Sequence, residues 1–88
     1  MKKVFLNAAS IRNETQAPDY LKYAFRLDDK DALDLDRLYS VIMSIKEETV
    51  IELDDSDLLI ENLGRYGLGL IKLLRDAEHE SEFITFDW

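Results

Sequence analysis

Three short runs of β-prone residues stand far apart along this chain, and their spacing limits the folds open to it. Residues 3–7 (KVFLN), 49–53 (TVIEL) and 83–86 (FITF) are rich in Val, Ile, Phe and Thr and have the length of strands. Helical patterns fill the two stretches between them, each long enough for two helices. Strands that alternate with helices pair in parallel through crossover connections. The sequence therefore predicts an α/β fold in which about four helices pack on a three-stranded parallel sheet.

Capping residues and apolar spacing place the helices. The expected segments are residues 16–26, 35–44, 57–63 and 66–80. Asp34 precedes the second helix and is a good N-cap residue, and Gly64 can end the third. We expect Gly64 and Gly67 to mark a helix break followed by the start of the fourth helix. Gly69 lies inside the fourth helix, where glycine is unfavourable, and it predicts close packing there.

Length and net charge restrict the number of domains and the kinds of partner that we expect for this chain. With 88 residues the chain is expected to form one domain, residues 1–88. Asp and Glu number 19 against 11 Lys and Arg, which gives a net charge of −8. Such a charge disfavours binding to nucleic acid or to an anionic membrane surface. It favours a basic protein as partner, because opposite charge accelerates association. The same charge also suits a small protein that only needs to stay soluble.

Other features bear on compartment and chemistry. The chain has no cysteine, so disulfides and thiol chemistry are excluded. No apolar run approaches the length that spans a bilayer, and the apolar part of MKKVFLNAAS is too brief for a signal peptide. We therefore expect a cytoplasmic protein.

Motifs for catalysis and metal binding do not fit the residues. The aspartate-rich run fails the EF-hand pattern, because a loop starting at Asp29 would have Asp34 where Gly is required and Ser40 where Glu is required. His79 is the single histidine and is expected near a helix C-terminus at the surface. No Ser or Thr has a matching base in a recognised pattern. We expect no enzymatic activity, no cofactor and no metal site.

The acid-rich segment 28–45 is the strongest candidate for function. In a helix after Asp34, an apolar stripe would face the core, and the opposite face would show Asp36, Tyr39, Ser40 and Met43 to solvent. This face has two interpretations. It is either a docking surface for a basic partner, or Asp34 and Asp36 only stabilise the helix N-terminus while Tyr39 lies at the edge of the core.

Several strings, in order, resemble the barstar family of small intracellular inhibitors of a secreted bacterial ribonuclease. They are KKVFLN, LDLDRLYSVIM (residues 33–43), TVIELD (49–54) and LRDAEHESEFIT (74–85). The resemblance covers nearly the whole chain. It implies a barstar-like fold in which the second helix and the preceding loop plug a ribonuclease active site, with carboxylates standing in for phosphates.

The resemblance also implies roles for individual residues. Asp36 matches the first aspartate of the second helix, Tyr39 a tryptophan, and Asp76 an interface glutamate of the last helix. Ser40 stands where the family has its most important inhibitory aspartate, and Lys30 where it has a loop tyrosine.

The resemblance thus predicts an inhibitor or immunity protein that blocks a basic ribonuclease or related toxin. Its partner-binding residues would be Lys30, Asp34, Asp36, Tyr39, Ser40, Met43 and Asp76. The change at Ser40 favours an alternative: an interaction module or regulator of the same fold with no nuclease target.

Overall fold

The computed structural model describes residues 1–27 and 34–88. These residues form strands β1 (Lys2–Asn7), β2 (Thr49–Asp54) and β3 (Ile84–Asp87), a short 3-10 turn η1 (Ala8–Ser10), and helices α1 (Ala17–Phe25), α2 (Leu35–Met43), α3 (Ser56–Leu63) and α4 (Arg65–Glu80). Each strand and α-helix begins and ends within one residue of its predicted bounds. The predicted α/β class, with a parallel three-stranded sheet and four helices, is confirmed.

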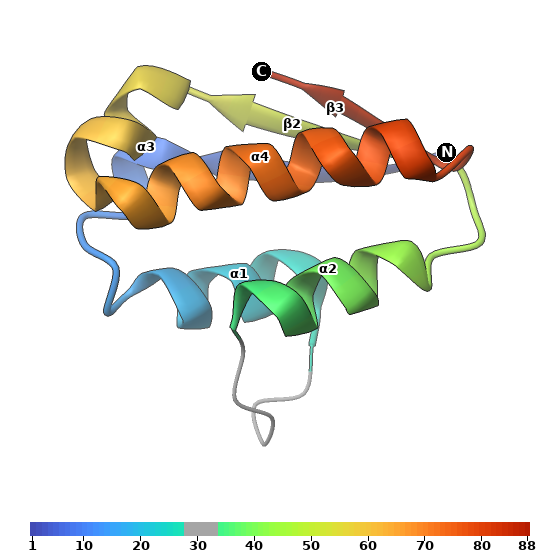
Figure 1. Ribbon diagram of the computed structural model, residues 1–88, viewed down its shortest axis with the longest axis horizontal. Helices are drawn as coiled ribbons and strands as arrows, with labels where there is room; N and C mark the ends of the chain where they lie inside the picture. Colours follow the sequence, from blue (N-terminus) through green and yellow to red (C-terminus); the bar gives the residue numbers. More distant parts are fainter. Residues whose placement is uncertain (28–33) are drawn as a thin grey trace.

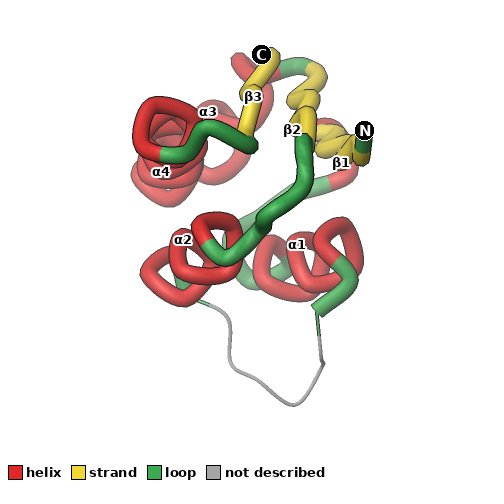
Figure 2. The backbone as a smooth tube through the Cα atoms, turned by 90° about the vertical axis from the view of Figure 1, so that its right-hand side faces the viewer, coloured by secondary structure: helices red, strands yellow, loops and turns green. Residues whose placement is uncertain are grey.

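The sheet has the strand order β1-β2-β3, and both pairs of neighbours are parallel (Figure 1). Parallel neighbours require a crossover between them, and here α1 with α2 forms the first crossover and α3 with α4 the second. All four helices lie on the same side of the sheet (Figure 2). The sheet therefore has one covered face and one open face.

The alternation of side chains along each strand matches this one-sided covering. One set of alternating residues is buried against the helices: Val4 and Leu6 of β1, Thr49, Ile51 and Leu53 of β2, and Ile84 and Phe86 of β3. The intervening residues point to the open face and remain wholly or partly exposed, as a period of two requires. Thr49 is polar, and its hydroxyl donates a hydrogen bond to the carbonyl of Glu47 at 3.0 Å. One continuous core of aliphatic side chains and two phenylalanines results.

Helix α4 packs closely on its neighbours at two glycines. A Cβ atom on Gly67 would lie 2.5 Å from the backbone oxygen of Leu59 in α3. A Cβ on Gly69 would lie 3.1 Å from Cδ1 of Leu35 in α2. The expected close packing at Gly69 is thus confirmed. Gly67 lies in the first turn of α4, at the start of the fourth helix as expected, and its missing side chain allows the backbone of α3 to approach.

No α-helix in residues 1–27 or 34–88 is both long and apolar enough to cross a membrane.

Candidate functional site

Helix α2 is positioned by the cap that its sequence predicts. The carboxylate of Asp34 accepts a hydrogen bond of 2.7 Å from the backbone N–H of Arg37, and Asp34 itself has an extended backbone. This bond satisfies one of the N–H groups that a helix N-terminus leaves without an intrahelical partner. Leu38 and Ile42 are fully buried beneath the helix, so its orientation on the core is set by its apolar stripe.

A shallow groove of about 370 Å³ lies between α2 and α4. We call it the α2–α4 groove; its lining residues are Leu35, Asp36, Tyr39, Gly69, Lys72, Leu73 and Asp76. Gly69 allows α2 and α4 to approach closely at the groove, because an added Cβ would lie 3.1 Å from Cδ1 of Leu35. The groove is open to solvent along its length and carries polar groups from both helices.

Three residues that the sequence predicted as partner-binding meet in this groove. Asp36 and Tyr39 come from α2, and Asp76 comes from α4, 37 positions further along the chain than Tyr39. Asp36 and Asp76 are exposed, whereas Tyr39 is half-buried and packs against the core. The tertiary structure therefore combines two carboxylates and an aromatic ring on one surface.

The other predicted residues have different surroundings. Ser40 is exposed, and its hydroxyl donates a hydrogen bond of 3.2 Å to the carbonyl of Asp36 within the same helix. Met43 is half-buried against the core. Asp34 is exposed but accepts the capping bond described above. Lys30 lies outside the described residues.

The expectation that a whole face of α2 points to solvent therefore needs correction. Asp36 and Ser40 are exposed as predicted, but Tyr39 and Met43 are only partly so. Tyr39 lies against α4 in the groove, so neighbouring elements cover more of α2 than its apolar stripe alone indicates. Tyr39 packs at the edge of the core and also lines the groove, and its role in docking stays a prediction.

Lys72 is a groove residue that we did not predict. It adds a cation to a groove that the carboxylates of Asp36 and Asp76 also line. The spacing of α4 contains the signal, since Gly69, Lys72, Leu73 and Asp76 are three or four positions apart and so share one helix face. What the spacing does not reveal is that this face borders α2.

Tyr66 adds an unusual polar group close to the start of α2. Its hydroxyl oxygen is buried, and the described residues offer it no hydrogen-bond partner. Burial raises the pKa of Tyr66, and the negative charges of Glu14 and then Asp34 raise that pKa further. The hydroxyl therefore stays neutral at physiological pH beside the acidic N-terminus of α2.

The groove carries polar and aromatic groups that can contact another molecule. Its exposed carboxylates can accept hydrogen bonds from Arg or Lys of another molecule, and the edge of Tyr39 offers an aromatic surface for packing. Within residues 1–27 and 34–88, no group of three or more His, Asp or Glu side chains is placed to hold a metal ion.

No protein-family model matches this chain, and no curated protein matches it in sequence.

Proposed function

We propose that this chain is a barstar-like inhibitor or immunity protein that binds and blocks a basic ribonuclease or related toxin. The observation that carries the proposal is the convergence of Asp36, Tyr39 and Asp76 in the α2–α4 groove. They are three of the seven partner-binding residues predicted from the sequence, and they come from two separate helices. The parallel three-stranded sheet with helices on one face is also consistent with a barstar-like fold.

The proposed mechanism is electrostatic mimicry. A ribonuclease binds the phosphates of RNA with cationic side chains, and carboxylates can take the place of those phosphates. Asp36 and Asp76 would pair with cations of the partner, while Tyr39 would pack against its surface. The net charge of −8 would attract a basic protein from a distance and accelerate association at low ionic strength. An inhibitor of this kind would act in the cytoplasm and would need no cofactor.

Charge reversal in the groove tests the proposal. The partner is a secreted, basic bacterial ribonuclease, and the readouts are cleavage of a fluorogenic RNA and stopped-flow association. The wild-type protein should inhibit cleavage, and Asp36→Lys or Asp76→Lys should slow association roughly tenfold at low salt, because each replaces attraction by repulsion.

A matched control variant distinguishes the effect of the groove on binding from the effect of net charge. Glu61→Lys changes the net charge equally but lies on the exposed surface of α3, outside the groove. It should retain most of the inhibition. Equal losses in all three variants, or full inhibition by Asp36→Lys, would contradict the assignment of the groove as the binding surface.

A second candidate is an interaction module with the same fold and no nuclease target. The hydroxyl of Ser40 favours it, because that group bonds to its own helix and supplies no negative charge where the family has an aspartate. Failure of the wild-type protein to inhibit any basic ribonuclease, together with capture of another protein that Asp36→Lys abolishes, would support this second function.

A further inference from the structure

The two edges of the sheet are protected to different extents. At the β3 edge, the outward N–H of Phe86 donates a 2.7 Å hydrogen bond to the carboxylate of Glu78 in α4. At the β1 edge, the N–H of Asn7 donates a 2.8 Å bond to the hydroxyl of Tyr20 in α1. Side chains from the covering helices thus occupy positions where another strand could pair.

The first half of β1 has no such protection. The backbone N–H of Lys2 donates to the carbonyl of Glu48 beside β2, so the backbone groups of Lys2 face inward. Because these groups alternate in direction along a parallel strand, those of Lys3 and Phe5 face away from the sheet. The described residues supply no hydrogen-bond partner for these outward groups of Lys3 and Phe5. They form a short unpaired edge, which is a template for strand addition.

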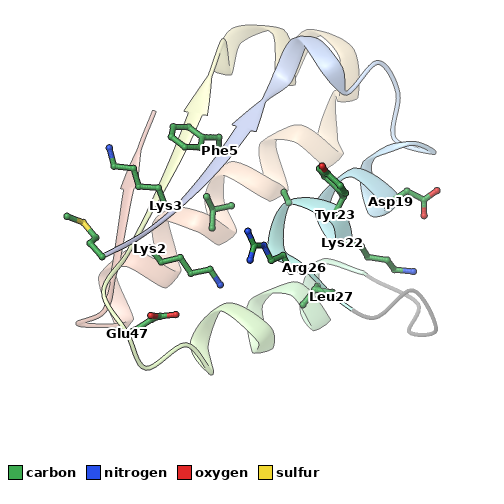
Figure 3. Close-up of a pocket in the computed structure, with 12 residues that line it drawn as sticks. Lys2, Lys3, Phe5, Asp19, Lys22, Tyr23, Arg26, Leu27 and Glu47 are labelled. Atoms are coloured by element: carbon green, nitrogen blue, oxygen red, sulfur yellow. The ribbon is translucent and has the colours of Figure 1, made fainter.

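A groove of about 910 Å³ runs along this edge, between β1 and the C-terminal part of α1 (Figure 3). We call it the edge groove. Large side chains around it are unusually exposed for their type: Met1 is 83% exposed, Phe5 61% and Tyr23 85%. Exposed aromatic side chains beside an unpaired strand edge are a feature that binding surfaces share.

The charge of the edge groove is opposite to that of the whole protein. Lys2, Lys3, Lys22 and Arg26 line it together with Asp19 and Glu47. Four of the chain's 11 basic residues therefore gather here, although the chain as a whole carries −8. Lys2 and Arg26 extend toward each other across the hollow, whereas Lys3 and Phe5 point to the other face of the sheet (Figure 3).

We propose that the edge groove binds an extended acidic peptide segment of another protein, which pairs with the outward backbone of Lys3 and Phe5 as a fourth strand. Side chains of such a strand alternate between the two faces. Acidic residues on the helix side would lie between Lys2 and Arg26, and apolar residues on the other side would pack beside Phe5.

Charge also selects against a second copy of this chain. Pairing of two β1 strands would bring Lys2 and Lys3 of one copy near the lysines of the other, and like charges on facing strands are destabilising. Lysines on an edge strand commonly prevent self-association in this way. An acidic strand removes the repulsion and neutralises Lys2, whereas Lys3 lies on the other face, where its ammonium group is 3.9 Å from the carboxylate of Glu52.

The test uses the full chain and a short, blocked, fluorescently labelled peptide of alternating valine and glutamate. Fluorescence anisotropy should show saturable binding, and NMR hydrogen exchange should show that the peptide protects the amides of Lys3 and Phe5. Two peptide controls accompany it. A valine–lysine peptide tests the charge, and a valine–glutamate peptide with N-methylated backbone on one edge tests strand pairing. Each should bind at least about tenfold more weakly.

Protein variants locate the binding. Lys2→Glu should weaken binding of the valine–glutamate peptide at least about tenfold, and Lys2→Arg should retain it. Arg65→Glu makes the same charge change on an exposed residue of α4 outside the edge groove and should have little effect. Lys2 does not line the α2–α4 groove, so Lys2→Glu should not alter ribonuclease binding there.

Several results would overturn the proposal. They are absence of saturable binding, equal binding of the N-methylated peptide, and equal losses in Lys2→Glu and Arg65→Glu. Concentration-dependent dimerisation that protects the Phe5 amide without any peptide would also overturn it, since the occupant would then be a second copy.

Discussion

Single residues in this protein take positions that follow from their own chemistry. Asp34 caps α2 because a short carboxylate can reach the N–H of Arg37. Gly69 supports the approach of Leu35 because it has no side chain. Tyr66 is the exception, because its buried hydroxyl has no hydrogen-bond partner among the described residues. Such a group reduces stability relative to an apolar ring of the same shape.

Tyr66→Phe is expected to increase the free energy of unfolding at neutral pH, by about 1 kcal/mol, because it removes a buried polar atom that lacks a partner. Urea unfolding followed by far-ultraviolet circular dichroism measures it. Tyr23→Phe is the control, because Tyr23 is 85% exposed and its hydroxyl is accessible to water. A loss of more than about 1 kcal/mol in Tyr66→Phe would indicate that the hydroxyl makes a stabilising bond.

The same residue predicts a pH dependence at alkaline pH. The pKa of Tyr66 in the folded protein is raised by burial and by Glu14 and Asp34. Between the unfolded value of about 10 and this raised value, the folded state keeps a proton that the unfolded state has lost. The free energy of unfolding is therefore unaffected by ionisation of Tyr66 below about pH 10, and it falls as the pH rises through the folded pKa.

Comparison of variants isolates this contribution. As the pH rises above about 10, wild type should lose more stability than Tyr66→Phe, as measured by urea unfolding at several alkaline pH values. Parallel curves for wild type and Tyr66→Phe would contradict the prediction.

At the scale of elements, helix ends and helix contacts position the α2–α4 groove. Helix α2 begins at a capped N-terminus, and α4 contacts α3 and α2 through Gly67 and Gly69. The two glycines differ in what surrounds them, since Gly67 faces backbone and Gly69 faces the end of a leucine side chain. Backbone moves only with its whole helix, whereas a leucine can change rotamer.

Gly67→Ala should therefore destabilise the protein by about 1–3 kcal/mol, since the new methyl group would force α3 and α4 apart. Gly69→Ala is the matched substitution in the same helix. It should cost less, because Leu35 can shift and alanine favours the helix by about 1 kcal/mol over glycine. Chemical denaturation of both variants measures the difference. Equal stabilities would contradict the backbone contact at Gly67.

The N-cap of α2 gives a second prediction at this scale. Asp34→Ala should lower the free energy of unfolding by about 1 kcal/mol, because the N–H of Arg37 loses its acceptor. Asp36→Ala removes the same charge two positions later without removing the cap, and it should cost less. Thermal unfolding of the two variants side by side is the measurement, and a larger loss in Asp36→Ala would contradict the capping role.

At the scale of the whole molecule, charge is distributed unevenly. The net charge of −8 contrasts with the basic edge groove, while the α2–α4 groove carries exposed carboxylates. Two surfaces of opposite charge can bind two partners of opposite charge. The excess of acid has a cost in stability, because like charges repel more strongly in the compact state than in the unfolded chain.

Added salt should therefore stabilise the protein. We expect the melting temperature to rise by a few degrees, roughly 2–5 °C, from very low to physiological ionic strength, as salt screens the repulsion. Choline chloride should give the same rise as sodium chloride, because screening depends on ionic strength. A melting temperature that falls or does not change with salt would contradict the expectation that repulsion dominates.

Much of this structure follows from the sequence alone because its causes are local. Strand and α-helix positions depend on side-chain periodicity and on caps such as Asp34, and each was predicted to within one residue, whereas the 3-10 turn η1 was not predicted. Asp36 and Ser40 were placed correctly on the solvent side of α2 for the same reason.

Tertiary structure decided what depends on distant parts of the chain meeting. Only the packing of α2 on α4 brings Asp36 and Tyr39 beside Lys72 and Asp76, and only the contact with Leu59 explains Gly67. The half-burial of Tyr39 and the open edge of β1 also depend on tertiary neighbours that local sequence patterns do not predict. Periodicity tells which side of an element is apolar, but the groove arises where two elements meet, so its residues could be found only in three dimensions.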